Sequence, residues 1–465
     1  MPEGDVSEVG DQTSVPADVR SEHCYDVIVV GGGIAGLSAA YRLRTHDTLV
    51  LEASERPGGR VFSHSSDTGI QNFGAHMFGG PGTVVGDLCL ELGLSLRPID
   101  AGLMGFTFQD QLMLDAKPAL LPFLIPLPPL ARISLLKAGA RLRIGAARAG
   151  SCLARTAQNG WDQMTEARFA NGDDKTLSRY LGVLHPAAAK IMQAITERCG
   201  GDPTQISAGH GLRSFANVWS SSSPGFNLCG GSSKFPEALA AALGNRLRLG
   251  SRVNDVSREG DGVVVTGQDG HGQPFRYRAK TAILATPAPI TKRIASDLPE
   301  PTRNALGEVR YGPFLSVSVN TTEDTPGLLE ETYAVSTPQA AFSVLFNQAT
   351  NRFSLGGHEL GGSLMMFAGA DRAAQLLSLS DDQIIENFMD DLKRLIPSLS
   401  GITNPTVCRW ENGAPFAFPG RSSLQPELTR PIDRVALAGD YLEFPNMEAA
   451  INSAHEAARR VSAWL

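Results

Sequence analysis

The apolar positions near the N-terminal end of the chain change from a strand pattern to a helix pattern and back. Residues 25–30, YDVIVV, form a β-branched and apolar run, as expected for a strand buried on both faces. The next residues, IAGLSAAYRLR, have helical periodicity, and TLVLE at 48–52 predicts a second buried strand. Further buried strands are predicted at ILATP (283–287) and VALAG (435–439). Together these runs predict an α/β unit.

A second group of runs has a different character. FLSVSVNT, TYAVST, AFSVLFNQ and SLMMFAGA predict four strands of a separate sheet, and DDQIIENFMDDLKRLI predicts an amphipathic helix. The stretch 246–289 predicts strands joined by hairpins, ending in ILATP. With 465 residues, the chain is too long for one ordinary hydrophobic core, so we expect two lobes.

Glycines lie where the first strand meets the first helix. Gly31, Gly33 and Gly36 are spaced as GxGxxG, and Glu52 ends the second strand. Gly31 permits a tight turn, Gly33 lets a pyrophosphate approach the backbone, and Gly36 lets helix and strand pack closely. The helix N-terminus favours the phosphates, and Glu52 is placed to accept hydrogen bonds from a ribose. The motif predicts dinucleotide binding, but by itself it does not separate NAD from FAD.

Two further motifs distinguish FAD from NAD as the cofactor. ERPGGR follows Glu52, and AGDYLEFPNMEAAIN stands near the end of the chain. Both resemble signatures of the superfamily of flavin amine oxidases, protoporphyrinogen oxidases and phytoene desaturases, and the likeness extends over nearly the whole chain from residue 24. The resemblance implies FAD as cofactor. Besides Gly31, Gly33, Gly36 and Glu52, it implies as cofactor-binding residues Gly58, Gly59, Arg60, Val253 (at the adenine), Gly439, Asp440 (at the ribityl chain), Met447, Glu448 and Ala449 (at the pyrimidine edge).

The resemblance also implies the domain organisation. It predicts an α/β fold in which a Rossmann-like, GR2-type FAD-binding domain consists of 24–96, 226–307 and 406–465. A second, α+β domain with a mixed or antiparallel sheet would bind the substrate and consist of 97–225 and 308–405. Residues 1–23, rich in acids and without an apolar block, are expected to be a disordered tail.

The implied chemistry is FAD-dependent oxidation. We expect an oxidase or dehydrogenase that removes a hydride, by C–C desaturation or C–N oxidation, from a bulky hydrophobic small molecule and is reoxidised by oxygen. One alternative is an amine or amide oxidase of specialised metabolism, and another is a non-redox flavoenzyme such as a mutase, isomerase or dehydroxylase. A non-enzymatic binding protein of the same fold would lack the cofactor residues Glu52, Arg60 and Asp440, which are all present here.

Two departures from the amine oxidases bear on the substrate. The strand YGPFLSVSVN (311–320) has no lysine where many amine oxidases have one, and Asn446 stands where many have the second aromatic residue of an amine cage. The first aromatic would fall near 412–413, with Phe416 and Phe418 close by in the sequence as alternatives. Asn446 is therefore a candidate catalytic residue, as is His76 in FGAHMFGG, the segment that usually reaches the flavin ring. Alternatively, His76 has only a structural role and packs against the cofactor and the backbone.

Composition and charge limit the possible protein classes, partners and locations. Apolar residues make up 42% of the chain and charged residues 19%, a composition typical of a globular protein. The net charge of −7 gives no general attraction to nucleic acid. Six scattered cysteines without a CxxC pair predict neither a metal site nor a disulfide framework, and we expect a cytoplasmic protein. No run reaches the ~18 apolar residues of a membrane span. The acid-free stretch 117–155 begins with the apolar run PALLPFLIPLPPL and continues with six bases. It predicts peripheral membrane contact or, alternatively, the mouth of a substrate tunnel. The sequence does not predict the oligomeric state.

Overall fold

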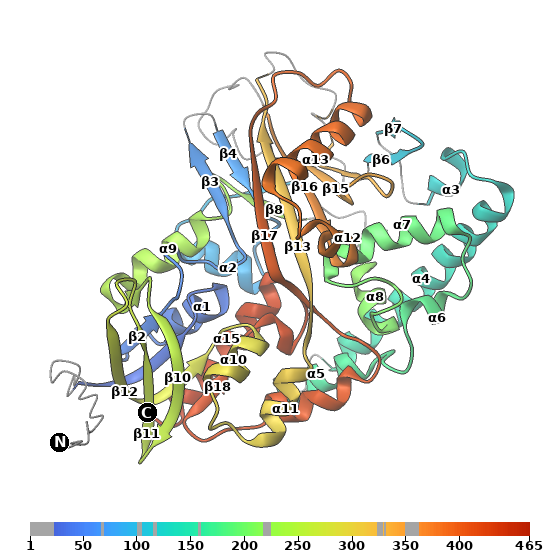
Figure 1. Cartoon of the computed structure of the whole chain (residues 1–465). Helices are drawn as coiled ribbons and strands as arrows, with labels where there is room; N and C mark the ends of the chain where they lie inside the picture. Colours follow the sequence, from blue (N-terminus) through green and yellow to red (C-terminus); the bar gives the residue numbers. More distant parts are fainter. Residues whose placement is uncertain are drawn as a thin grey trace, which may run out of the picture.

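The computed structural model describes residues 23–66, 69–99, 105–114, 119–156, 160–216, 225–322, 329, 332–348 and 362–465. Residues 1–22 of the expected N-terminal tail lie outside the described residues. The described chain forms two sheets with helices around them (Figure 1). The first sheet lies with the chain's C-terminus toward the lower part of that view, and the second sheet lies above it.

The first sheet is built around β1 (Cys24–Val30), as the sequence predicts. Its order is β10-β11-β12-β1-β2-β9, and β18 also pairs with β12. Pairing is parallel between β1 and β2, β1 and β12, β2 and β9, and β12 and β18, whereas β10, β11 and β12 are antiparallel. The other strands are β2 (Thr48–Leu51), β9 (Leu247–Arg248), β10 (Arg252–Glu259), β11 (Gly262–Gln268), β12 (Pro274–Leu284) and β18 (Val435–Leu437).

Both faces of this sheet are covered, which explains the continuous apolar run of β1. Val27 and Val29 pack into one core with α1 (Ile34–Arg42), α2 (Val84–Glu91), α9 (Lys234–Leu243) and α15 (Met447–Ser462). Ile28 and Val30 point to the other face. That face is covered by α10 (Ala288–Ile294), α11 (Glu300–Glu308) and α14 (Gln425–Thr429). The alternation along β1 therefore divides the apolar side chains between two cores.

The second sheet has the order β17-β13-β16-β15-β14-β6-β7. It is antiparallel except for the parallel pair β14 and β6, so it is a mixed sheet. Its strands are β6 (Gly105–Phe108), β7 (Gln111–Met113), β13 (Arg310–Asn320), β14 (Ala334–Ser336), β15 (Val344–Asn347), β16 (Ser363–Gly369) and β17 (Thr403–Phe416). One face packs on α13 (Asp381–Leu395), the predicted amphipathic helix, and on α12 (Ala370–Leu376). The four predicted strands are thus present.

β17 runs along β13 in the second sheet as far as Phe416, whereas the last FAD-binding segment is predicted from the sequence to start at 406. The chain rejoins the first sheet at β18. The domain ranges as a whole remain a prediction.

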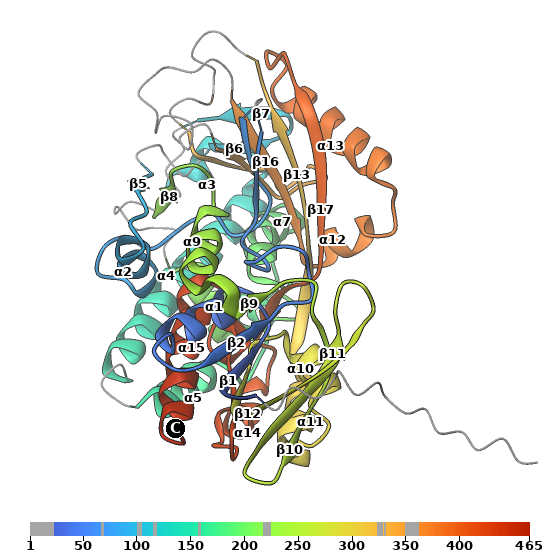
Figure 2. The ribbon, with the colours of Figure 1, turned by 90° about the vertical axis from the view of Figure 1, so that its left-hand side faces the viewer.

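The rest of the described chain is mostly helical. A helical layer lies beside the second sheet, on the right in Figure 1, and lies partly behind other elements in Figure 2. It contains α3 (Leu121–Leu124), α4 (Pro129–Thr156), α5 (Trp161–Ala170), α6 (Leu177–Leu181), α7 (Pro186–Thr196) and α8 (Ala208–Ser214). Two small ribbons, β3 (Ser63–Ser66) with β4 (Gly69–Asn72) and β5 (Leu96–Pro98) with β8 (Phe226–Leu228), complete the fold. Among the described residues, no helix is long and apolar enough to cross a bilayer.

β4 links the two sheets. Ser316 Oγ on β13 donates to the carbonyl of Phe73 at 2.8 Å, and Ser363 Oγ on β16 donates to the carbonyl of Ile70 at 2.6 Å. Asn72 bonds to both sides, since its Nδ2 donates to Gln348 Oε1 at 3.0 Å and its Oδ1 accepts from the amide of Ser232 at 3.0 Å. Because the segment 73–80 continues from β4, it is held between the two sheets, where a site shared by both domains would lie.

Candidate functional site

The glycine turn lies between the end of β1 and the start of α1. Gly31 has φ +107°, and a Cβ there would lie 2.9 Å from the carbonyl oxygen of Ala285. A Cβ on Gly36 would lie 1.8 Å from the carbonyl oxygen of Gly31, so a side chain would separate the helix from the turn. At Gly33, by contrast, a Cβ would meet no described atom within 4 Å. The backbone at the N-terminus of α1 is therefore open to a phosphate group.

Glu52 is held against this turn. Its Oε2 accepts a hydrogen bond from the Gly32 amide at 2.6 Å, and its Oε1 accepts from the Ser54 amide at 2.8 Å and from Ser54 Oγ at 2.7 Å. A Cβ on Gly32 would lie 2.7 Å from the Glu52 Cβ, so only glycine fits there. The roles of Gly32 and Ser54 were not predicted from the sequence. The uninterrupted glycine triplet was the available signal for Gly32.

Val253 lies close to Glu52 at the end of β2. The amide of Ser251 donates to the Glu52 carbonyl at 2.7 Å, and the Glu52 amide donates to the Arg248 carbonyl at 2.9 Å. Val253, two residues further on, is half-buried at a point where the register of β10 against β11 shifts. The structure therefore brings the expected adenine contact close to the expected ribose anchor.

The PGGR turn packs onto the first glycine turn. The Gly58 amide donates to the Gly32 carbonyl at 2.8 Å. Gly58 and Gly59 both have positive φ, at +104° and +55°, and a Cβ on Gly58 would lie 2.7 Å from Pro236 Cγ. Both backbone conformations favour glycine, and Gly58 in addition leaves no space for a side chain.

Arg60 and Asp440 meet although 380 positions separate them in the chain. Arg60 Nη2 donates to Asp440 Oδ1 at 2.8 Å, and Nη1 donates to the Gly413 carbonyl at 3.0 Å. Burial lowers the pKa of Arg60, but the Asp440 carboxylate more than offsets this, so the net pKa of Arg60 is raised and the guanidinium stays charged. Asp440 is positioned by Gly439, whose amide donates to Ser453 Oγ at 2.9 Å. The two residues expected at the phosphate and ribityl region thus form one ion pair.

The N-terminus of α15 contains the remaining predicted cofactor residues. Met447 is buried in the core of the first domain. The Val85 amide lies 3.4 Å from Glu448 Oε1, to which it donates. The Ala449 amide donates to Asn446 Oδ1 at 2.8 Å, so Asn446 is the N-cap of the helix. The structure thereby gives Asn446 a structural contact, and its catalytic role remains a prediction.

His76 is buried between the domains. Its Nδ1 lies 2.9 Å from the Gly74 carbonyl oxygen. Because a carbonyl can only accept, Nδ1 carries the hydrogen and Nε2 presents a lone pair. Nε2 is buried and has no hydrogen-bond partner among the described residues. Burial lowers the pKa of His76 to about 4, against an opposing contribution from the Gly74 carbonyl, so the ring is neutral near pH 7.

Apolar side chains of the second sheet face His76. This apolar wall consists of Phe314, Tyr333, Phe346, Met365 and Phe367. The His76 ring meets Phe346 edge-on with centroids 4.6 Å apart, and Phe314 meets Phe367 edge-on at 4.7 Å. The hydroxyl of Tyr333 donates to Asn227 Oδ1 at 3.1 Å.

The strands of the wall were predicted from the sequence, but these residues were not singled out. Met365 and Phe367 belong to the wall, whereas Leu364 and Met366 pack under α13 on the other face of the sheet.

The structure also shows why no aromatic side chain stands at 413. A Cβ on Gly413 would lie 2.5 Å from Phe314 Cγ, so Phe314 takes the space beside β17. Together with the capping contact of Asn446, this means that neither expected cage position holds an aromatic ring here.

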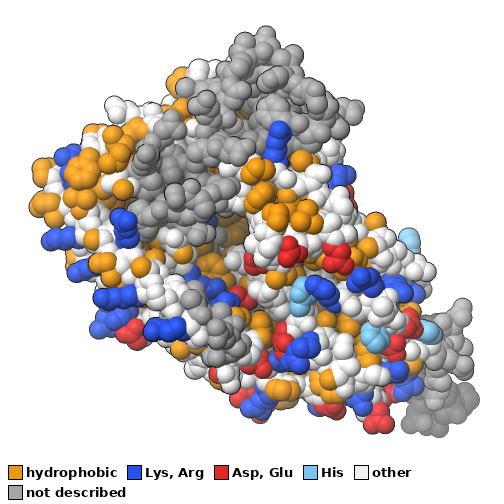
Figure 3. All heavy atoms as spheres, turned by 180° about the vertical axis from the view of Figure 1, so that it is seen from behind, with side chains coloured by type: hydrophobic (Ala, Val, Ile, Leu, Met, Phe, Trp, Pro, Cys, Tyr) orange, Lys and Arg blue, Asp and Glu red, His pale blue; other side chains and the backbone are white. Residues whose placement is uncertain are grey.

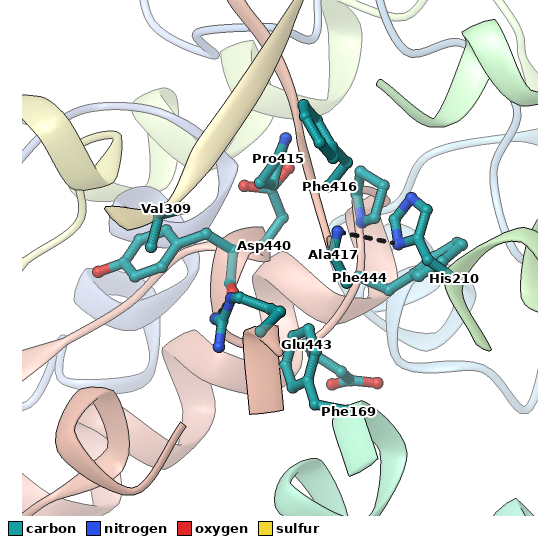
Figure 4. A pocket seen from close by; sticks show the side chains of 12 residues that line it. Phe169, His210, Val309, Pro415, Phe416, Ala417, Asp440, Glu443 and Phe444 are labelled. Atoms are coloured by element: carbon teal, nitrogen blue, oxygen red, sulfur yellow. Dashed lines mark hydrogen bonds between the residues drawn. The ribbon is translucent and has the colours of Figure 1, made fainter. Parts of the chain in front are cut away.

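A small pocket next to Asp440 is lined by side chains from α5, α8, β17 and the loop after β18 (Figure 4). His210 Nδ1 accepts from the Ala417 amide at 3.4 Å, and its Nε2 donates to the Cys199 carbonyl at 2.9 Å, so both ring nitrogens are used. Glu443 forms an ion pair with Arg168, and Arg213 lies 4.1 Å over the ring of Phe444. These contacts fix the loop that carries Asp440.

The described residues fit FAD. The turn at Gly33 is open where a pyrophosphate would approach, Glu52 supplies a carboxylate at the ribose position, and Arg60 with Asp440 supplies a donor and an acceptor for the ribityl region. The N-terminus of α15 is suited to stabilise negative charge on the pyrimidine edge. Among the described residues, no three His, Cys, Asp or Glu side chains come together as metal ligands would.

Comparison with known proteins agrees with this arrangement. The family model described as flavin containing amine oxidoreductase matches residues 34–462. A flavin-containing amine oxidase of Oncorhynchus mykiss is 28% identical over 62% of this chain and 55% of its own length. A putative flavin-containing monoamine oxidase of Mycobacterium tuberculosis is 28% identical over 59% of this chain and 60% of its own length. The chain thus matches less than two thirds of these relatives.

Solved structures show the same fold. Cyclohexylamine oxidase from Brevibacterium oxydans superimposes with a TM-score of 0.77, covering 95% of this chain and 99% of that one at 18% identity. A putrescine oxidase bound to putrescine superimposes with a TM-score of 0.75, with the same coverage and 18% identity. The expected fold class, an α/β FAD-binding domain with a second α+β domain, is confirmed. The chain belongs to the flavin-containing amine oxidoreductase family.

Proposed function

We propose that this enzyme removes a hydride from a bulky hydrophobic small molecule held against the apolar wall, and that the oxidised carbon bears an amine nitrogen. The observation that carries the proposal is the wall itself, which presents Phe314, Phe346 and Phe367 toward the segment 76–77. Sites of this kind bind apolar ligands with a few polar groups for orientation. Bound FAD supplies the two-electron acceptor.

The chain's own residues would orient the substrate and handle its proton. The rings of the wall exclude water from the reacting carbon and hold the apolar body. His76 Nε2, neutral and without a partner among the described residues, is available to accept a hydrogen bond from a substrate N–H. An amine entering as a cation would first have to lose a proton, because burial disfavours charge beside these rings.

Two considerations favour a monoamine with an apolar body. The relatives in the family include proteins named as amine oxidases, which supports C–N oxidation. The wall presents aromatic and thioether surface, so a linear diamine would place its second ammonium group against apolar side chains. A cyclic or aryl-bearing amine suits that surface better.

We also propose oxygen as the electron acceptor, because the sequence has no second nucleotide fingerprint that would bind NADPH. Anaerobic mixing of the FAD-loaded enzyme with cyclohexylamine, benzylamine or putrescine tests both proposals. The apolar amines should bleach the flavin absorbance, and admitting air should restore it while hydrogen peroxide accumulates.

Bleaching by putrescine alone would overturn the assignment of a hydrophobic substrate. Bleaching that persists after air is admitted would overturn the assignment of oxygen. An unchanged spectrum with all amines, combined with a rearranged product from another substrate, would favour a non-redox flavoenzyme.

A further inference from the structure

Exposed apolar side chains are concentrated on α3 and the first half of α4. Of the ten exposed large hydrophobic residues in the described chain, seven lie between 120 and 144. Phe123 is 61% exposed and Leu130 is 73% exposed. The seven are Leu120, Phe123, Leu124, Leu130, Ile133, Leu136 and Ile144. We call this group the α3–α4 patch. A cluster of this kind marks an interaction surface.

The arrangement follows from the periodicity of α4. Ala131, Leu135, Ala138 and Leu142 recur at helical spacing and are buried in the core of the helical layer. The opposite side of the same helix faces outward, yet Leu130, Ile133 and Ile144 occupy it. The inward-facing apolar stripe of α4 is therefore already buried in the core. The α3–α4 patch is additional apolar surface without a partner among the described residues.

Bases surround the patch. Arg132, Lys137, Arg141, Arg143, Arg148 and Arg155 lie on α4, and residues 117–161 contain no acid. Within the described chain, none of these six bases forms an ion pair with a carboxylate. Figure 3 shows hydrophobic and basic side chains together along the edge where α3 and α4 lie.

The charge of the whole chain makes this edge unusual. Residues 117–161 hold seven bases, so the remaining residues carry a net charge of −14 where the whole chain carries −7. The molecule is thus strongly polarised, with one basic and apolar edge on an acidic body. An anionic surface would attract this edge and repel the rest, which selects one orientation.

We propose that the α3–α4 patch docks the enzyme onto an anionic lipid surface. The apolar side chains would enter the headgroup region while the long basic side chains reach lipid phosphates. A second copy of the chain fits this surface poorly, because a two-fold contact would place bases against bases. The proposal is independent of the substrate assigned above.

The test uses the full-length FAD-loaded protein and sedimentation with vesicles. We expect binding to vesicles of phosphatidylcholine mixed with phosphatidylglycerol, weak or no binding to phosphatidylcholine alone, and release as salt is raised. Phe123→Ser combined with Leu130→Ser should reduce binding at least tenfold, and so should Arg143→Glu combined with Arg148→Glu. The matched control is Leu90→Ser with Arg293→Glu, which changes an exposed apolar residue (51%) and an exposed base elsewhere.

Three results would overturn the proposal. The first is absence of sedimentation with the mixed vesicles at low salt by the wild-type protein. The second is equal loss of binding in the control and in the patch variants, which would mean a non-specific effect. The third is a change from dimer to monomer in the Phe123→Ser, Leu130→Ser variant without a change in vesicle binding, which would assign the patch to self-association. Flavin absorbance of each variant shows that it is folded and loaded.

Discussion

The His76 side chain is buried, and its Nε2 acceptor has no partner among the described residues. The burial determines its charge state. Its pKa is lowered to about 4 because the ring is desolvated, with the Gly74 carbonyl acting in the opposite sense. The exposed imidazole of an unfolded chain has its ordinary pKa of 6.5. The unfolded state therefore binds more protons than the native state between these two values, and the stability should decrease as pH falls through that window.

The His76→Asn variant tests the predicted loss of stability at low pH. We expect it to be less sensitive to pH between about 6.5 and 4 than the wild type, by up to about 3 kcal/mol in the free energy of unfolding. Thermal melts of the FAD-loaded proteins at a series of pH values measure the difference. His271→Asn, which changes an exposed histidine, should follow the wild type. Parallel curves for His76→Asn and the wild type would contradict a neutral, buried His76.

The ion pair of Arg60 and Asp440 leads to a second prediction. Asp440→Asn removes the negative charge opposite the Arg60 guanidinium and replaces one of the two carboxylate oxygens, expected at the ribityl region, with an NH2 group that cannot accept a hydrogen bond. Losing one charge-assisted hydrogen bond should weaken FAD retention by about 10- to 100-fold, measured by dialysis and flavin absorbance. Glu259→Gln breaks an exposed pair with Arg278 and should leave retention unchanged. Full FAD retention by Asp440→Asn would separate this pair from the cofactor.

The start of α15 distinguishes two roles for Asn446. Asn446→Ala removes the N-cap bond to the Ala449 amide and should cost about 1 kcal/mol in the free energy of unfolding. Asn446→Ser keeps an uncharged cap acceptor in the same place and should restore stability. Ser380→Ala, which removes the cap of α13, provides a control far from the site in the chain.

Turnover of Asn446→Ser then decides the role. If Asn446 only caps the helix, turnover should remain close to the wild-type rate. Lost turnover in a variant of wild-type stability and full flavin content would instead assign it to the chemistry.

Elements with a strong local pattern could be predicted from sequence. The alternation and runs of β1, β2 and β13–β16 and the amphipathic period of α13 are local properties, and all of these elements are present. The placement of β17 could not be predicted in the same way. Its pairing with β13 depends on contacts between distant segments, and NPTVCRWENGAPF has no clean alternation.

At the scale of the whole molecule, the cofactor residues come from three distant stretches of the chain. Gly31, Gly36 and Gly58 carried a local signal, because close backbone or side-chain approach leaves room only for glycine there. Arg60, Val253 and Asp440 were implied by the resemblance to the family and by no local pattern. The apolar wall was not predicted, because its rings look like ordinary core residues until the second sheet is placed against His76. The α3–α4 bases were recognised from the absence of acids, whereas the exposure of the neighbouring apolar residues required the structure.

Removal of FAD should destabilise the whole enzyme. The predicted cofactor residues connect β1, β18 and α15 with the PGGR turn, and Arg60 also contacts β17 of the second sheet. Ligand that binds only the native state at about 1,000 times its Kd contributes about 4 kcal/mol. The apoprotein should therefore melt several degrees lower, and adding FAD back should restore the melting temperature. Equal melting temperatures with and without FAD would show that the cofactor does not stabilise this fold.

Hydride removal from an apolar substrate at the wall is the central proposal, and the rate of anaerobic flavin reduction tests it most directly. Stopped-flow absorbance should show reduction by cyclohexylamine that saturates with concentration and is at least tenfold faster than reduction by putrescine, a preference worth about 1.4 kcal/mol. Phe367→Ala should reduce this preference, because it removes part of the wall. Equal reduction rates for the two amines, or a faster rate with putrescine, would contradict the assignment of the wall as the substrate site.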